Sequence, residues 1–162
     1  MVRNVCLRAS RALARSEDGG ELVEAGLSLV LFCALLFLVI DTGWGLFVKA
    51  TLQHAAAEGV RYGVTGQTSG SSGQTASITS VVQSQAMGLL DSQAGTIAIR
   101  FYDPANLTQT ASNASGNLLE VSIEGYQFTP LAALLRSGAA VPITVRASDI
   151  IEPSPGGVPP AL

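Results

Sequence analysis

The feature that most constrains this chain is a run of 16 residues without a charge, residues 25–40, near the N-terminus. A helix of that length rises only ~24 Å, which is short of the ~30 Å hydrocarbon core of a bilayer. Extended past Asp41 to Val48, the helix rises ~36 Å, which is ample. The sequence therefore predicts one membrane-spanning helix that includes Asp41 and places Trp44 near the interface, where tryptophan is favoured.

Two other interpretations compete for this run. A secretory signal peptide normally has an apolar region of ~7–15 residues and a cleavage site after it, whereas the segment after this run reads as continuing helix. A core helix of a soluble protein is less favoured still, because no other part of the chain could bury a helix that is apolar all round. A membrane span is the preferred interpretation.

The placement of the arginines predicts the orientation. Four of them precede the span, at Arg3, Arg8, Arg11 and Arg15, whereas only Lys49 follows it immediately. Basic residues favour the cytoplasmic side of a membrane. We therefore expect a cytoplasmic leader over residues 1–19, a single pass through the cytoplasmic membrane, and a C-terminal domain outside it.

The residue inventory argues against several classes of function. The net charge is −3 and no basic patch is present, so we expect no nucleic-acid partner. His54 is the only histidine and no CxxC motif occurs, so we expect no zinc site. Cys6 and Cys33 lie in the leader and the span, which leaves the outer domain without a disulfide. Without a catalytic constellation or a phosphate-binding loop, we expect no enzyme and no cofactor.

The helix is predicted to continue beyond the membrane, so that residues 20–62 form one element. A stripe of mostly small residues recurs there at helical spacing, and it could accept another helix closely or pack on the chain's own sheet. The stripe consists of Val48, Leu52, Ala55 and Gly59. Residues 63–77 are rich in Gly, Ser and Thr, which predicts a flexible linker.

Residues 78–151 are expected to form a small α+β domain. An amphipathic helix over residues 78–90 precedes three segments of alternating polarity, and a short capped helix is predicted at 129–136. The alternation predicts a three-stranded antiparallel sheet covered on one face. The inward residues are expected to be Ile97, Ile99, Phe101, Leu119, Val121, Ile123, Ile143 and Val145. Residues 152–162 contain four prolines, which predicts a disordered tail.

Charges on the polar face of the sheet predict the strand order. Arg100 and Arg146 lie on the first and third segments, whereas Glu120 and Glu124 lie on the second. Each glutamate can meet an arginine across a strand pair only if the second segment lies in the middle. Exposed pairs of this kind contribute little energy, so they indicate order rather than stability.

The junction between leader and span carries the candidate functional residues. Gly19 and Gly20 form a glycine pair, which we expect to be extended and accessible to a protease. Glu24 stands directly before the apolar run, where a buried carboxylate is expensive. Glu24 is equally consistent with a residue that marks the cytoplasmic boundary and faces lipid headgroups.

With these features, residues 19–62 resemble the TadE-like family, the minor pseudopilins of the tight-adherence (Flp) pilus machinery. The resemblance rests on Gly19, on residues 22–25 (LVEA), on residues 41–44 (DTGW) and on residues 52–62 (LQHAAAEGVRY). This chain has Ala25 where the family usually has an aromatic residue, and Asp41 where it usually has glutamate.

The resemblance implies a structural or assembly subunit of a type IV pilus or a related secretion system. By similarity, a prepilin peptidase would cut after Gly19, and Glu24 would neutralise the new amine of a neighbouring subunit at Gly20. The implied partners are the lipid bilayer, the peptidase, other pilin or pseudopilin subunits, and pilus assembly proteins. The alternative left open is an unprocessed, membrane-anchored binding module with an extracytoplasmic domain.

Overall fold

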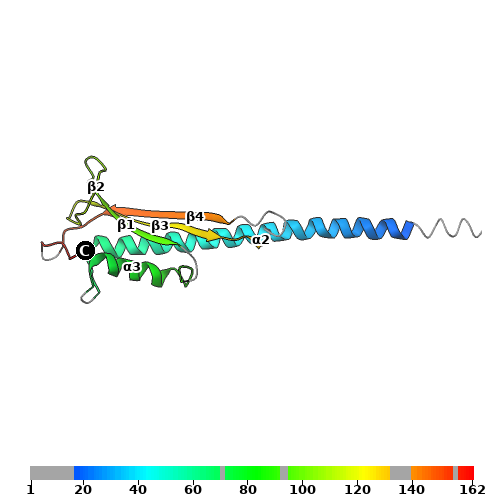
Figure 1. Cartoon of the computed structure of the whole chain (residues 1–162), viewed down its shortest axis with the longest axis horizontal. Coiled ribbons are helices and arrows are strands. Elements are labelled where there is room, and N and C mark those ends of the chain that lie inside the picture. Colours follow the sequence, from blue (N-terminus) through cyan, green and yellow to red (C-terminus); the bar gives the residue numbers. More distant parts are fainter. Residues whose placement is uncertain (1–16, 70–71, 92–94, 132–139, 155–156) are drawn as a thin grey trace, which may run out of the picture. The chain divides into compact units, whose positions relative to one another are not determined.

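The computed structural model describes residues 17–69, 72–91, 95–131, 140–154 and 157–162. Most of the predicted leader, and residues 132–136 of the helix predicted at 129–136, lie outside these residues. The elements in chain order are α2 (Glu17–Val64), α3 (Gln74–Gln85), β1 (Thr96–Tyr102), β2 (Gln109–Thr110), β3 (Leu118–Phe128) and β4 (Val141–Ile150) (Figure 1). The chain forms two compact units, Met1–Thr42 and Gly43–Leu162. We call the second unit the C-terminal domain.

Helix α2 is one uninterrupted element of 48 residues. The sequence before Gly63 contains no proline, so every turn keeps its backbone N–H donors. Gly43 and Gly45 lie inside the helix without ending it. The predicted continuation to about Tyr62 is confirmed, and the helix runs on to Val64.

The first unit consists of the apolar part of α2. This is the one helix in the described residues that is long and apolar enough to cross a membrane. Its most apolar 18-residue window has a mean hydropathy of 2.6, and none of that window is buried. Since a soluble core helix would be mostly covered by its own protein, the structure fits a single-pass membrane anchor instead.

The C-terminal domain contains an antiparallel sheet with the strand order β2-β1-β3-β4. The predicted α+β class and the central position of β3 are confirmed. The predicted number of strands is wrong, because β2 pairs with the end of β1 between the first and second predicted strands. A strand of two residues is too short to show alternation, so no sequence pattern could reveal it.

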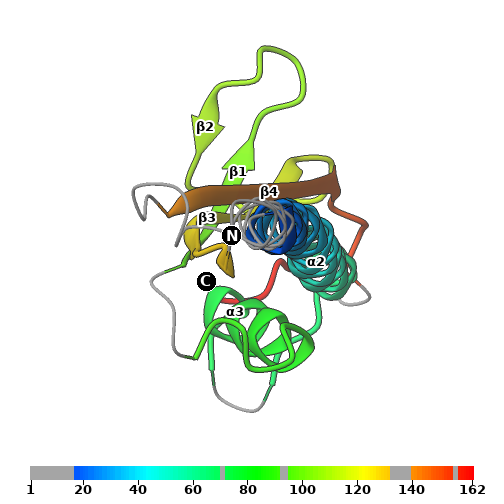
Figure 2. The same cartoon turned by 90° about the vertical axis from the view of Figure 1, so that its right-hand side faces the viewer.

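One face of the sheet carries the core, and α3 and the C-terminal half of α2 lie on that side (Figure 2). Five of the predicted inward residues are buried, and Ile97, Ile99 and Ile143 are partly buried against the same core. The predicted stripe on α2 is buried in full. It packs on the chain's own α3 and sheet, which is one of the two arrangements that the sequence left open.

The segment predicted as a flexible linker is shorter than expected. Helix α3 begins at Gln74 rather than near residue 78, and both Gln74 and Ser77 are buried. The Gln74 side chain donates a hydrogen bond to the Gly63 carbonyl (2.8 Å) and accepts one from Asn113 (2.6 Å). In the sequence, a buried polar residue such as Gln74 cannot be told from a linker residue, because its hydrogen-bond partners are remote along the chain.

The described part of the tail makes hydrogen bonds with the rest of the domain. The Gln74 backbone N–H donates to the Ala161 carbonyl (2.7 Å), and the Asn113 side chain donates to the Pro160 carbonyl (2.7 Å). Upstream, the Glu152 N–H donates to the Val64 carbonyl (3.0 Å). Proline removes backbone donors but leaves its carbonyl free to accept, so a proline-rich segment can still be fixed by donors from outside it.

Candidate functional site

The predicted cleavage site lies in the first turn of α2. Gly19 and Gly20 are helical and exposed, which corrects the expectation that the pair is extended. A Cβ atom built on either glycine would meet no described atom within 4 Å. Packing within the described residues therefore gives no reason for glycine at these two positions.

Glycine instead weakens this end of the helix. It is ~1 kcal/mol less favourable than alanine in a helix interior, because it loses more backbone freedom on folding. The first turn also lacks carbonyl partners for its N–H groups. Two adjacent glycines there lower the cost of unwinding the first turn, and a peptidase requires an extended backbone in its active site.

Glu24 lies about two turns into the helix and is exposed. Residues four apart lie on one side of a helix, with a rise of ~6 Å between them, so Glu24 shares a face with Gly20. The residues between them, Leu22 and Val23, are 77% and 70% exposed. The carboxylate therefore stands at the edge of an uncovered apolar surface.

That apolar surface continues along the whole first unit. Every Leu, Val, Phe and Ile from residue 22 to residue 40 keeps between 42% and 77% of its surface exposed. A continuous apolar surface of this kind normally marks contact with lipid or with another protein. Asp41 differs from its neighbours, since it is only 6% exposed. Its burial agrees with the high cost of presenting a carboxylate to lipid.

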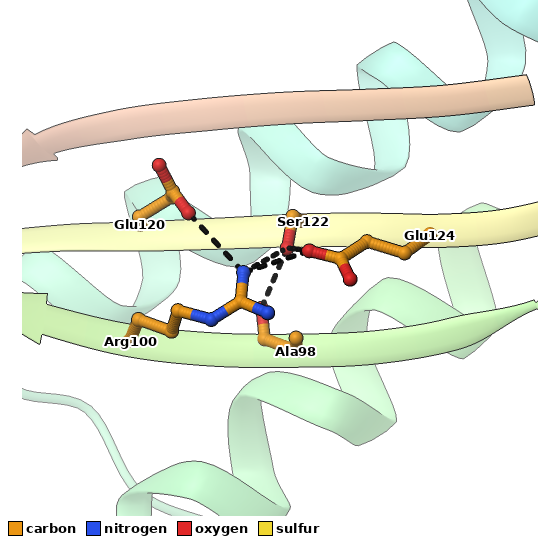
Figure 3. A network of polar contacts seen from close by, with 5 residues as sticks. All are labelled: Ala98, Arg100, Glu120, Ser122 and Glu124. Atoms are coloured by element: carbon orange, nitrogen blue, oxygen red, sulfur yellow. Dashed lines mark hydrogen bonds and ion pairs between the residues drawn. The ribbon is translucent and has the colours of Figure 1, made fainter.

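A polar network on the other face of the sheet joins β1 and β3 (Figure 3). The Arg100 guanidinium donates to Glu124 (2.7 Å), to Ser122 (3.0 Å) and to Glu120 (3.4 Å). The Ser122 hydroxyl donates in turn to Glu124 (2.9 Å). The hydrogen bond from Arg100, assisted by the one from Ser122, lowers the pKa of the Glu124 carboxyl.

This network fits a structural role in the sheet. The hydrogen bond that Arg100 donates to Glu124 is also the main reason that the pKa of Arg100 is raised. Both groups therefore stay charged, and each has its partners within the network. The expectation that each glutamate meets an arginine is confirmed, but Arg100 is the partner of both. Arg146 instead lies opposite Ser122 in the register of β3 with β4. In the described part of the chain, no three His, Cys, Asp or Glu side chains gather to hold a metal ion.

The sequence pointed to the two glycines and Glu24 as candidates, and their roles stay predictions. It did not reveal the polar contacts that order the segment after α2. Gln74 and Asn113 meet across 39 residues of chain, and neither belongs to a recognisable motif. The role of Gln74 becomes visible only in the structure, where its side chain is 0% exposed and its amide joins two segments by hydrogen bonds.

Comparison with known proteins agrees with the resemblance seen in the sequence. A family model described as TadE-like protein matches residues 19–61, which is most of α2. No curated protein and no solved structure matches the chain. The match begins at Gly19 and spans Glu24, the apolar run and the part of the helix that packs in the C-terminal domain. The resemblance to the TadE-like family is therefore confirmed over residues 19–61.

Proposed function

We propose that this chain is a non-enzymatic, minor-pseudopilin-like subunit of a Tad (Flp) type IV pilus or a related secretion system. A prepilin peptidase cuts it after Gly19. The observation that carries this proposal is an uncovered apolar helix whose first turn holds a glycine pair that no contact among the described residues requires. Such a helix suits a subunit that is anchored in lipid and later packs against the helices of other subunits.

The leader and the span define the expected placement of the chain. The arginines of residues 1–15 favour a cytoplasmic N-terminus, and the C-terminal domain then lies outside the membrane. Cleavage removes four arginines and two acidic residues, which changes the net charge from −3 to −5. The mature helix loses its basic anchor, so it can move outward into an assembly more easily.

Glu24 supplies the pairing group in this proposal. An unpaired carboxylate is costly once its helix packs among other helices. Cleavage creates a positively charged amine at Gly20, and a neighbouring helix displaced by ~6 Å along the axis brings its amine level with Glu24. At ~4 Å, two opposite charges attract several times more strongly near a protein than in bulk water.

Cleavage is tested by coexpression with the cognate peptidase. Gly19→Ala should slow cutting and leave the C-terminal domain folded, because no described atom lies near a Cβ at this position. Gly26→Ala is the matched control, since Gly26 is an exposed glycine of the same helix with the same open surroundings. Equal cutting of both variants would contradict the proposed site.

Glutamate pairing is tested in the assembled system. Glu24→Ala should still be cut but should incorporate poorly into the pilus or its assembly complex. Glu21→Ala is the control, because Glu21 is an exposed carboxylate of the same first turns. Assembly measured by copurification with partner subunits should fall for Glu24→Ala alone. If both variants assemble like the wild type, Glu24 has no pairing role.

A further inference from the structure

Apolar side chains gather at one end of the C-terminal domain, the end at which α2 enters it. A cleft of about 350 Å³ lies there, formed by residues of α2, by the segment after α3 and by the end of β3. Its lining includes Trp44, Met87, Leu89, Tyr126 and Phe128. Three segments that are remote in sequence therefore converge at the first turn of α2 within this domain.

Several side chains at and beside this cleft are exposed, whereas Tyr126, which lines it, is buried. Trp44 is 51% exposed and stacks on Phe47, which is 46% exposed, with their ring centroids 5.3 Å apart. Met87 is 73% exposed, and Val141 is 48% exposed. Phe128 pairs with Val141 between β3 and β4 and lies 3.6 Å from the position of a Cβ at Gly45. We call Trp44, Phe47, Met87, Phe128 and Val141 the apolar collar.

Met87 is unusual in its backbone as well as in its exposure. Helix α3 ends at Gln85 with Ala86 as its cap, and Met87 follows with φ at 53°. This left-handed position after a helix is normally occupied by glycine or asparagine, because other side chains are strained there. Met87 therefore adds an exposed apolar side chain, held in a strained backbone position, to this end of the domain.

We propose that the apolar collar is seated in the interfacial region of the lipid bilayer, so that the C-terminal domain rests on the membrane. This inference depends on the membrane anchoring proposed above. Lipid is the occupant because the membrane-spanning residues end at the collar along the same helix. The collar also has the composition of an interface, with Trp and Phe beside the exposed Lys49, whose ammonium can reach lipid phosphates.

The opposite end of the same domain provides a matched control. Leu107 lies between β1 and β2, next to the end of β1 that pairs with Leu118. Phe128 and Val141 pair at the opposite end of β3. It is 68% exposed and has φ at 56°, so it resembles Met87 in polarity, exposure and backbone conformation. Its contact with the bilayer is not expected, because no apolar collar surrounds it.

Nitroxide labels on the full-length protein in phosphatidylcholine vesicles test the inference. Met87→Cys and Leu107→Cys are labelled in a Cys6→Ser, Cys33→Ala background, and Val141→Cys serves as a second collar position. A label on the native Cys33, in a Cys6→Ser protein, reports the span. Paramagnetic resonance then compares collisions of each label with oxygen, which concentrates in lipid, and with a water-soluble nickel chelate.

We expect the labels at residues 33, 87 and 141 to collide mainly with oxygen, with residue 33 deepest, and the label at 107 to collide mainly with the chelate. A lipid signal at residue 33 with an aqueous signal at residues 87 and 141 would overturn the collar and leave the anchor intact. Aqueous signals at residue 33 as well would overturn both the collar and the membrane anchoring.

Discussion

Gly59→Ala should destabilise the C-terminal domain although alanine is the better helix former. Gly59 faces α3, and a Cβ atom there would lie 2.4 Å from the Val82 Cγ2 atom. Carbon atoms prefer ~3.5–4.0 Å, so the two elements must separate by about 1 Å or Val82 must leave its rotamer. Val82 is fully buried and β-branched, which makes both adjustments costly.

The magnitude follows from two opposing effects. Overpacking a close-packed core costs ~1–3 kcal/mol. Replacing glycine by alanine in a helix contributes ~1 kcal/mol in the other direction. We therefore expect a net loss of ~1–2 kcal/mol in the free energy of unfolding. Gly43→Ala is the control, since it adds the same methyl group to the same helix in open space and should give no loss or a small gain.

Denaturant unfolding of the full-length protein in detergent micelles, followed by near-UV circular dichroism, measures both variants. A double-mutant cycle isolates the contact between Gly59 and Val82. Val82→Ala alone should cost ~2 kcal/mol, because it removes two buried methyl groups. The double variant should cost no more than Val82→Ala alone, since the new methyl occupies the vacated space. Additive losses, or a Gly59→Ala protein as stable as Gly43→Ala, would refute the close-approach argument.

Two other predictions concern polar groups of the C-terminal domain. The folded-state pKa of Glu124 is lowered below its ordinary value of 4.5, so its pairing with Arg100 stabilises the domain above that pH. This stabilisation is lost as the pH falls through the folded-state pKa, and Glu124→Gln should flatten acid unfolding curves in that window; unchanged curves would contradict the network. Gln74→Leu should lower the free energy of unfolding by ~2–3 kcal/mol in the denaturant assay, because the Gly63 carbonyl and the Asn113 amide each lose a buried hydrogen-bond partner. A loss below ~0.5 kcal/mol would show that these two hydrogen bonds do not stabilise the domain.

Elements with a strong period were predictable from the sequence. The span, its continuation as α2, the three long strands and the central place of β3 all follow from apolar runs, alternation or charge. Arg100 and the two glutamates are a clear case, because a cross-strand charge pattern has few consistent strand orders. The same reasoning selected Gly19 and Glu24 as candidate residues, since both stand at an abrupt change of composition, and their roles stay predictions.

Features that depend on remote partners could not be predicted. Gln74 at the start of α3 donates a hydrogen bond to Gly63, and Asn113 donates one to Pro160 in the tail. The segments that contain Gln74 and Asn113 have the composition of a linker. The apolar collar was hidden for the same reason, because Trp44, Met87 and Phe128 come together only in the folded domain. The helical state of Gly19 and Gly20 was missed because glycine pairs usually end helices, whereas here the helix begins at Glu17.

The mature N-terminus tests the central claim most directly. The full-length protein should be expressed with its cognate prepilin peptidase, isolated from membranes and sequenced from its N-terminus. The proposed function predicts that the mature chain begins at Gly20, with Glu24 as its fifth residue. A chain that keeps residues 1–19 while the peptidase processes other substrates would contradict the account, and it would favour an unprocessed membrane-anchored binding module.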